Sequence, residues 1–137
     1  MRVFFDSSAF AKRYLGEPGS KAVIEWCDKA DEIVLAGIAL PEIVSAFCRL
    51  RREGLISEAQ YRQVKALLLA DIADIAVGDL TPAVMAEAIA ALEGNTLRAM
   101  DAIHIGSALV LKADRFVSGD KRQCDAAAGA GLRIDLV

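Results

Sequence analysis

The stretch Val3-Phe4-Phe5-Asp6-Ser7-Ser8, close to the start of the chain, indicates how the fold begins. Its first three residues are β-branched or aromatic and show no helical period, which predicts a short buried strand. Asp6 stands at the carboxyl end of that strand, and Ser7 or Ser8 can cap a helix that runs to about Leu15. A buried strand that passes directly into a helix is typical of a parallel α/β sheet.

The rest of the chain repeats this alternation of short apolar runs and helical patterns. Residues 57–60 form a capping box, and Thr81-Pro82 provides an N-cap followed by Pro at the first helical position. We expect further strands near residues 33–37, 75–77, 115–118 and within 132–137, and helices near 20–28, 40–53, 57–74, 82–94, 101–112 and 121–128. This order predicts a three-layer α/β/α sandwich with a mostly parallel central sheet, and residues 1–137 are expected to form a single domain.

The composition is that of an ordered globular protein. Of the 137 residues, 55% are hydrophobic and 26% are charged, and the net charge is −3. This charge argues against a protein that coats nucleic acid by bulk electrostatics, but it is compatible with an enzyme that gathers carboxylates around a cation. No apolar run approaches the roughly 20 residues of a spanning helix, and the apolar start is too short for a signal peptide. We therefore expect a cytoplasmic protein that has no membrane partner.

The three cysteines, Cys27, Cys48 and Cys124, are odd in number and form no C-x-x-C pair. Neither a disulfide framework nor a zinc site is indicated. We interpret them as reduced side chains that behave as small hydrophobic residues.

Carboxylates follow the predicted strands. Asp6 comes directly after the first strand and Asp120 after the strand at 115–118, while Glu42 opens the helix that follows the second strand. Ligands of open α/β sheets gather outside the carboxyl ends of the strands, so these three acids are expected to be neighbours. Asp101 has no clear strand before it and lies in an otherwise apolar helical run. A buried carboxylate there must be neutralised, hydrogen-bonded or bound to a cation.

Each polar residue taken alone has an ordinary structural explanation. Asp6 can be a helix cap, Glu42 a first-turn acid favoured by the helix dipole, and Asp120 a turn acid. His104 is the only histidine; in an apolar helix it is more typical of a packed, hydrogen-bonded residue than of a general base, and we leave it out of the catalytic set. Asp125 is expected to face solvent rather than to extend the acidic site.

Four stretches, taken in order and with their spacing, resemble the motifs of the PIN-domain family and, within it, of the VapC-type toxins. They are Phe5-Asp6-Ser7-Ser8-Ala9, Pro41-Glu42-Ile43-Val44-Ser45-Ala46, Met100-Asp101-Ala102-Ile103-His104 and Val117-Ser118-Gly119-Asp120-Lys121-Arg122. Each stretch alone is a weak signal. Together they extend the resemblance over essentially the whole chain, which implies a single PIN-like nuclease domain.

The resemblance implies a catalytic acidic pocket that holds Mg²⁺ or Mn²⁺. Its catalytic and metal-binding residues would be Asp6, Glu42, Asp101 and Asp120, with Ser8 and Ser118 supporting them by hydrogen bonds. Oxygen ligands of this kind select hard divalent cations. The implied activity is hydrolysis of RNA phosphodiester bonds by the toxin of a VapBC-type toxin–antitoxin pair, and the implied partners are RNA, a cognate antitoxin and a second copy in a homodimer.

Basic residues near the predicted site are candidates for RNA contacts: Lys12, Arg13, Arg49, Arg51 and Arg52. A solvated helix end explains the arginine cluster equally well. The apolar residues of the helices between 40 and 73 can belong to the core or can receive partner helices.

Two other functions remain open at this stage. The first is a catalytically inactive PIN-like module that binds RNA or protein, against which the presence of all four acids argues. The second is a phosphatase or phospho-receiver, but Asp6-Ser7-Ser8 lacks the second acid of the D-x-D motif that many such phosphatases use.

Overall fold

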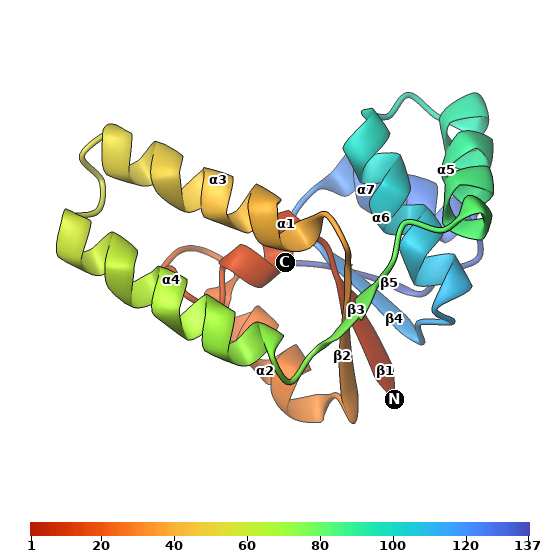
Figure 1. The fold of residues 1–137 in the computed structure, drawn as a ribbon. Helices are drawn as coiled ribbons and strands as arrows, with labels where there is room; N and C mark the ends of the chain where they lie inside the picture. The colour runs from red at the N-terminus through yellow and green to blue at the C-terminus, as the bar shows by residue number, and fades with distance from the viewer.

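The computed structural model describes residues 1–137, and one sheet of five strands runs through its centre (Figure 1). The strands are β1 (Arg2–Phe5), β2 (Glu32–Ala36), β3 (Ala76–Gly78), β4 (Arg115–Ser118) and β5 (Ile134–Leu136), in the order β3-β2-β1-β4-β5. Every neighbouring pair is parallel. The sheet expected to be mostly parallel is therefore parallel throughout, and β5 is the expected edge strand.

Helices cover both faces of the sheet, which confirms the three-layer fold (Figure 1). On one face lie α1 (Ser7–Ala11), α2 (Ser20–Lys29), α3 (Ala39–Arg52) and α4 (Glu58–Ile72). On the other lie α5 (Pro82–Gly94), α6 (Ala99–Val110) and α7 (Lys121–Gly129). No helix is both long enough and apolar enough to span a membrane.

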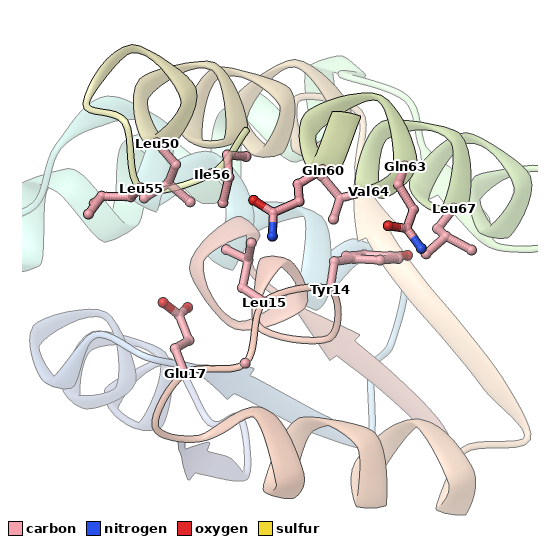
Figure 2. A pocket seen from close by; sticks show the side chains of 11 residues that line it. Tyr14, Leu15, Glu17, Leu50, Leu55, Ile56, Gln60, Gln63, Val64 and Leu67 are labelled. Atoms are coloured by element: carbon pink, nitrogen blue, oxygen red, sulfur yellow. The ribbon is translucent and has the colours of Figure 1, made fainter. Parts of the chain in front are cut away.

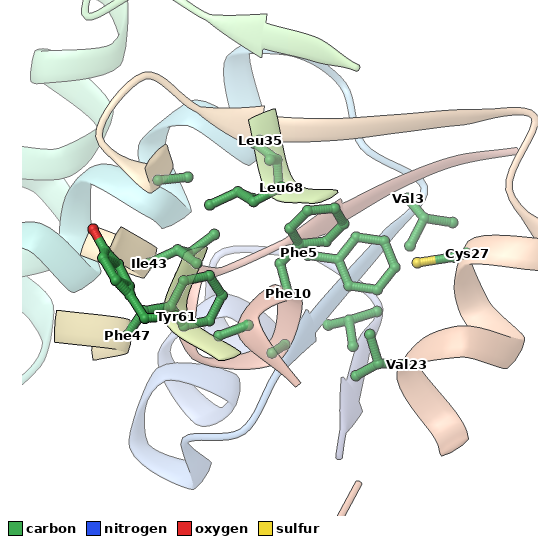
Figure 3. Close-up of a cluster of buried hydrophobic side chains, with 14 residues drawn as sticks. Val3, Phe5, Phe10, Val23, Cys27, Leu35, Ile43, Phe47, Tyr61 and Leu68 are labelled. Carbon is green, nitrogen blue, oxygen red and sulfur yellow. The ribbon is translucent and has the colours of Figure 1, made fainter. Parts of the chain in front are cut away.

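Two hydrophobic clusters fill the spaces between the three layers. Alternate residues of β1 point to opposite faces, so Val3 and Phe5 join the cluster under α1–α4 while Phe4 joins the cluster under α5–α7. The first cluster contains Phe10 and Phe47 (Figure 3). In the second, Phe4 stacks on Phe116 with 5.4 Å between the ring centroids. Because β1 is buried on both faces from Val3 to Phe5, these three residues are continuously apolar rather than alternating.

The sheet order places a crevice beside the end of β1. The chain runs from β1 outward through β2 and β3, and β4 then pairs with the opposite side of β1. Such a switch point is where ligands bind in open α/β sheets. Asp6 and Asp120 follow the two strands that flank it, and the amide of Asp6 donates to the Val117 carbonyl over 3.1 Å.

Several helix boundaries differ from the sequence expectation, and two of them bear on the site. The first helix ends at Ala11 rather than near Leu15, because the amides of the next three residues bond to carbonyls three residues back and tighten the chain into turns. Helix α6 begins at Ala99, two residues early, because Arg98 has an extended backbone and occupies the N-cap position. Asp101 lies in the expected helix, most of which is buried, but in its first turn beside the exposed Met100, so its side chain is half-buried rather than fully buried.

Candidate active site

Asp6 is the most deeply buried acid of the chain and is held by three donors. It is 2% exposed. The Ser8 hydroxyl and the Ala9 amide each donate to its Oδ1 over 2.8 Å, and the buried Ser118 hydroxyl donates to Oδ2. The two serines expected to support the acids thus both bind Asp6, and its carboxylate is fixed in one orientation.

Glu42 reaches the same place from the first turn of α3. Its Oε1 accepts the Ser7 hydroxyl over 2.7 Å and lies 2.6 Å from Nε2 of His104. His104 is buried on α6, on the other side of the crevice. Glu42 is therefore oriented by one side chain from α1 and one from α6.

Asp120 and Asp101 complete the set of acids. Asp120 caps α7, and its Oδ1 accepts the amide of Arg122 over 2.9 Å. The carboxylate of Asp101 receives no hydrogen bond, although its backbone carbonyl accepts from Gln123 Nε2 over 3.1 Å. Asp101 is thus the least constrained of the four carboxylates.

The four acids line a single hollow of about 210 Å³, which we call the acidic pocket. Nine residues line it and none is hydrophobic: Asp6, Ser7, Ser8, Glu42, Arg98, Asp101, His104, Asp120 and Gln123. No three histidine, cysteine or acidic side chains of the chain approach closely enough, as they stand, to hold a metal ion. The carboxylates therefore line a pocket rather than form a closed coordination sphere.

Comparison of the sequence with known proteins shows which family the chain belongs to. The sequence model of the family described as PIN domain matches residues 3–129. The chain belongs to the PIN-domain family. It is similar to Ribonuclease VapC45 and Ribonuclease VapC49 of two strains of Mycobacterium tuberculosis, with 28% identity to each over 134 residues, covering 96% of this chain and 93% of each relative.

Solved structures resemble this PIN domain over almost its whole length. FitAcB from Neisseria gonorrhoeae superposes with a TM-score of 0.71 at 14% identity, covering 96% of this chain and 95% of that one. The sarcin–ricin-loop-cleaving toxin VapC20 from Mycobacterium tuberculosis gives 0.67 at 16% identity, covering 95% of each. VapBC2 from Rickettsia felis gives 0.71 at 12% identity, covering 100% and 99%. These likenesses confirm the PIN-like fold.

The electrostatics of the pocket differ from one acid to the next. Burial raises the pKa of Asp6 despite the donors of Ser118 and Ala9, which work in the opposite direction. Burial and the negative charge of Asp120 raise the pKa of Asp101. Burial also disfavours the ionised form of Glu42, but the hydrogen bonds from His104 and Ser7 outweigh it and lower the pKa of this carboxyl. The pocket thus contains two acids, Asp6 and Asp101, whose ionised forms are disfavoured.

Sequence reasoning missed four residues that line the acidic pocket of this PIN domain. Ser7 and His104 hold Glu42, Gln123 holds the backbone of Asp101, and Arg98 brings a positive charge. The expectation that His104 is packed and hydrogen-bonded agrees with its burial, but its partner is a pocket acid. The sequence did contain a signal for Ser7: like Ser8, it is a hydroxyl residue that closely follows Asp6 at the end of a strand.

The expected solvent position of Asp125 agrees with the structure. Its carboxylate accepts from Lys121 over 3.0 Å and remains 66% exposed, so it pairs along α7 outside the acidic pocket.

The basic residues proposed for RNA contacts separate into two groups. Lys12 and Arg49 line a hollow that adjoins the acidic pocket. Arg13 instead pairs with Asp71 over 3.3 Å, and Arg51 stacks on Tyr61 with 4.1 Å from its guanidinium carbon to the ring centroid. Arg52 lines neither the pocket nor a hollow beside it. The structure therefore brings only two of the five residues to the site.

An apolar groove of about 510 Å³ lies between the turn after α1 and the pair α3–α4 (Figure 2). Leu15 and Tyr14 line one side of it, and Leu50, Ile56 and Val64 line the opposite side (Figure 2). Leu55 and Leu67, which also line it, are more than half exposed, at 67% and 51%. We call this the apolar groove; it shows that part of the apolar surface of residues 40–73 is not used by the core.

Proposed function

We propose that this PIN domain is a metal-dependent endoribonuclease that hydrolyses RNA phosphodiester bonds as the toxin of a VapBC-type pair. The observation that carries the proposal is the gathering of Asp6, Glu42, Asp101 and Asp120 on one pocket that has no hydrophobic lining. These acids come from four separate segments of the chain, so their meeting is a product of the fold. The names of the sequence relatives, both ribonucleases, support RNA as the substrate.

The donors of the acidic pocket suit a hard divalent cation, Mg²⁺ or Mn²⁺, held by the four carboxylates. Their oxygens are the ligands that such ions prefer. Asp101 receives no hydrogen bond and is destabilised as an anion by burial and by Asp120, so positive charge placed beside it would be favourable. A bound ion would supply Lewis-acid stabilisation of the negative charge that develops on the phosphate during hydrolysis.

The residues around the carboxylates would set their orientation before substrate arrives. Three donors fix Asp6, Ser7 and His104 fix one oxygen of Glu42, and a backbone amide holds Asp120. No hydrogen bond within the chain fixes the carboxylate of Asp101. Preorganised polar groups of this kind reduce the reorganisation that the reaction itself requires.

We extend the proposal to an antitoxin partner that binds in the apolar groove. Structures similar to this chain include a toxin–antitoxin complex from Klebsiella pneumoniae. An apolar groove whose lining includes exposed leucines is the kind of surface that takes the apolar face of a helix. The homodimer that the family resemblance implies, and a cytoplasmic location, stay predictions.

The decisive experiment is cleavage of a mixed RNA pool by purified protein with Mg²⁺, with Mn²⁺ and with EDTA. The Asp101→Asn variant, purified in the same way, controls for contaminating nucleases. Cleavage that requires both the ion and Asp101 supports the proposal. If neither ion gives cleavage and neither raises the melting temperature, the catalytically inactive binding module becomes the better description.

A further inference from the structure

Two hollows adjoin the acidic pocket. The first, of about 440 Å³, is lined by Lys12 and Arg49 among others and is called here the Arg49 hollow. The second, of about 190 Å³, is lined by Thr96, Leu97 and Arg122 among others and is called the Arg122 hollow. Each therefore places basic side chains next to the carboxylates.

The two hollows open from different sides of the acidic pocket. The Arg49 hollow shares Glu42 with the pocket, whereas the Arg122 hollow shares Asp101 and Asp120. Arg98 is the only residue that lines all three. The surface thus offers a continuous path from one hollow, past the acids and Arg98, to the other.

The arginines along this path have no acidic partner. Of the ten arginines of the chain, five form ion pairs: Arg2, Arg13, Arg51, Arg62 and Arg115. Of the other five, three line the path, namely Arg49, Arg98 and Arg122, and all three are exposed. Their guanidinium groups are available for phosphates, which they can bind through two parallel hydrogen bonds.

From this arrangement we propose that a single RNA strand crosses the acidic pocket between the two hollows. Arg49 and Arg122 bind phosphates on opposite sides of the cleaved bond, and Arg98 binds a phosphate at the pocket itself. The inference rests on the proposed function and specifies how the substrate lies. A chain of net charge −3 with four clustered acids repels a polyanion, so local cations on both sides of the pocket are needed to offset that repulsion.

Binding along this path depends on phosphates rather than on base stacking. Neither hollow has a Phe, Tyr or Trp in its lining. Aromatic platforms supply much of the affinity of many proteins for single strands, and they are absent from these walls. The affinity for RNA must then fall steeply as salt is added, with a slope set by the number of phosphates contacted.

The test measures binding of a short mixed-sequence single-stranded RNA in the Asp101→Asn background with Mg²⁺, over a range of salt concentrations. Arg49→Gln, Arg98→Gln and Arg122→Gln are each expected to reduce the slope of log affinity against log salt by about 0.7, the contribution of one phosphate contact. The double variant at positions 49 and 122 is expected to lose about twice that amount, because one strand touches both. Arg133→Gln is the matched control, since Arg133 is exposed, has no acidic partner and precedes the amino end of β5, whereas the acids follow the carboxyl ends of β1 and β4.

The outcomes separate this inference from the proposed function. If the wild type cleaves RNA but the Arg49 and Arg122 variants keep the full slope, the path is wrong and the nuclease stands. The path is equally wrong if the double variant loses no more than either single variant, or if Arg133→Gln loses as much as they do. If the wild type does not cleave and the Asp101→Asn protein does not bind RNA, the proposed function fails and this inference fails with it.

Discussion

Nε2 of His104 lies 2.6 Å from Oε1 of Glu42, across the crevice between α6 and α3. The same oxygen accepts the Ser7 hydroxyl, whereas Oε2 of Glu42 receives no hydrogen bond. The other ring nitrogen of His104 is buried without a partner. The ring therefore acts through Nε2 alone, which must carry the hydrogen that is donated to the carboxylate.

This contact predicts a graded effect of substitutions at position 104 on metal affinity. Without the imidazole, Glu42 keeps only Ser7 as a donor, and loss of such a supporting contact typically weakens metal binding by about 10- to 100-fold. His104→Leu is expected to fall in that range. His104→Gln, whose amide can place an N–H close to Nε2, is expected to stay near the wild type. The measurement is the Mn²⁺ concentration that gives half-maximal stabilisation in thermal melts; equal losses in both variants would mean that the ring only fills space.

Two buried serines provide a matched pair for the role of hydrogen bonds in stability. Ser118 and Ser107 are both 0% exposed, but Ser118 donates to Asp6 whereas the Ser107 hydroxyl has no partner. Ser118→Ala leaves a buried carboxylate oxygen without its donor and is expected to lower the free energy of unfolding by about 1–3 kcal/mol. Ser107→Ala removes an unsatisfied hydroxyl and is expected to be neutral or stabilising. Urea denaturation of both variants checks this, and a larger loss in Ser107→Ala would contradict it.

Asp101→Asn is expected to stabilise the metal-free protein. Because the pKa of Asp101 is raised in the folded state, its contribution to stability is present in acid and is lost as the pH rises through that pKa. The melting temperature of the variant minus that of the wild type, measured in EDTA, should therefore increase from mildly acidic to neutral pH. Mn²⁺ should raise the melting temperature of the wild type more than that of the variant. Unfolding of the variant at neutral pH would instead make Asp101 a structural residue.

The three cysteines are expected to differ in reactivity towards a thiol reagent. Burial raises the pKa of Cys124 to about 11 and also raises that of Cys27, and both side chains are almost inaccessible. Since the thiolate is the reactive form, only Cys48 should be labelled in the native protein at mildly alkaline pH. All three should react after denaturation. Rapid labelling of two or more native thiols, resolved by mass spectrometry, would show that the cores under α2 or α7 open readily.

Most of the fold could be predicted because its elements have local signals. The run at residues 3–5 is apolar because β1 is buried on both faces, and both Ser57 and Thr81 cap their helices as expected. The boundaries that were missed depend on contacts distant in sequence or on backbone geometry. Arg98 illustrates this, since its extended backbone, which no residue preference requires, decides where α6 begins.

The candidate site was predictable where an acid follows a strand. Asp6 and Asp120 could be placed together because the strands before them are parallel neighbours. The position of Asp101 could not be derived in this way, and only the family resemblance brought it to the pocket. The contact between His104 and Glu42 joins residues 62 positions apart on two different helices, and no periodicity reports such a pairing.

The apolar groove and the Arg49 hollow share Leu15, Glu17 and Leu50. Anything that covers these three residues from the groove also occupies one wall of the hollow, although it need not touch any of the four acids of the acidic pocket. Two ligands that compete for a common wall are negatively coupled, and that coupling is the same whichever of them binds first. A partner bound in the groove could therefore inhibit RNA cleavage without any conformational change in the enzyme. Abundant RNA would in turn lower the affinity of the enzyme for that partner.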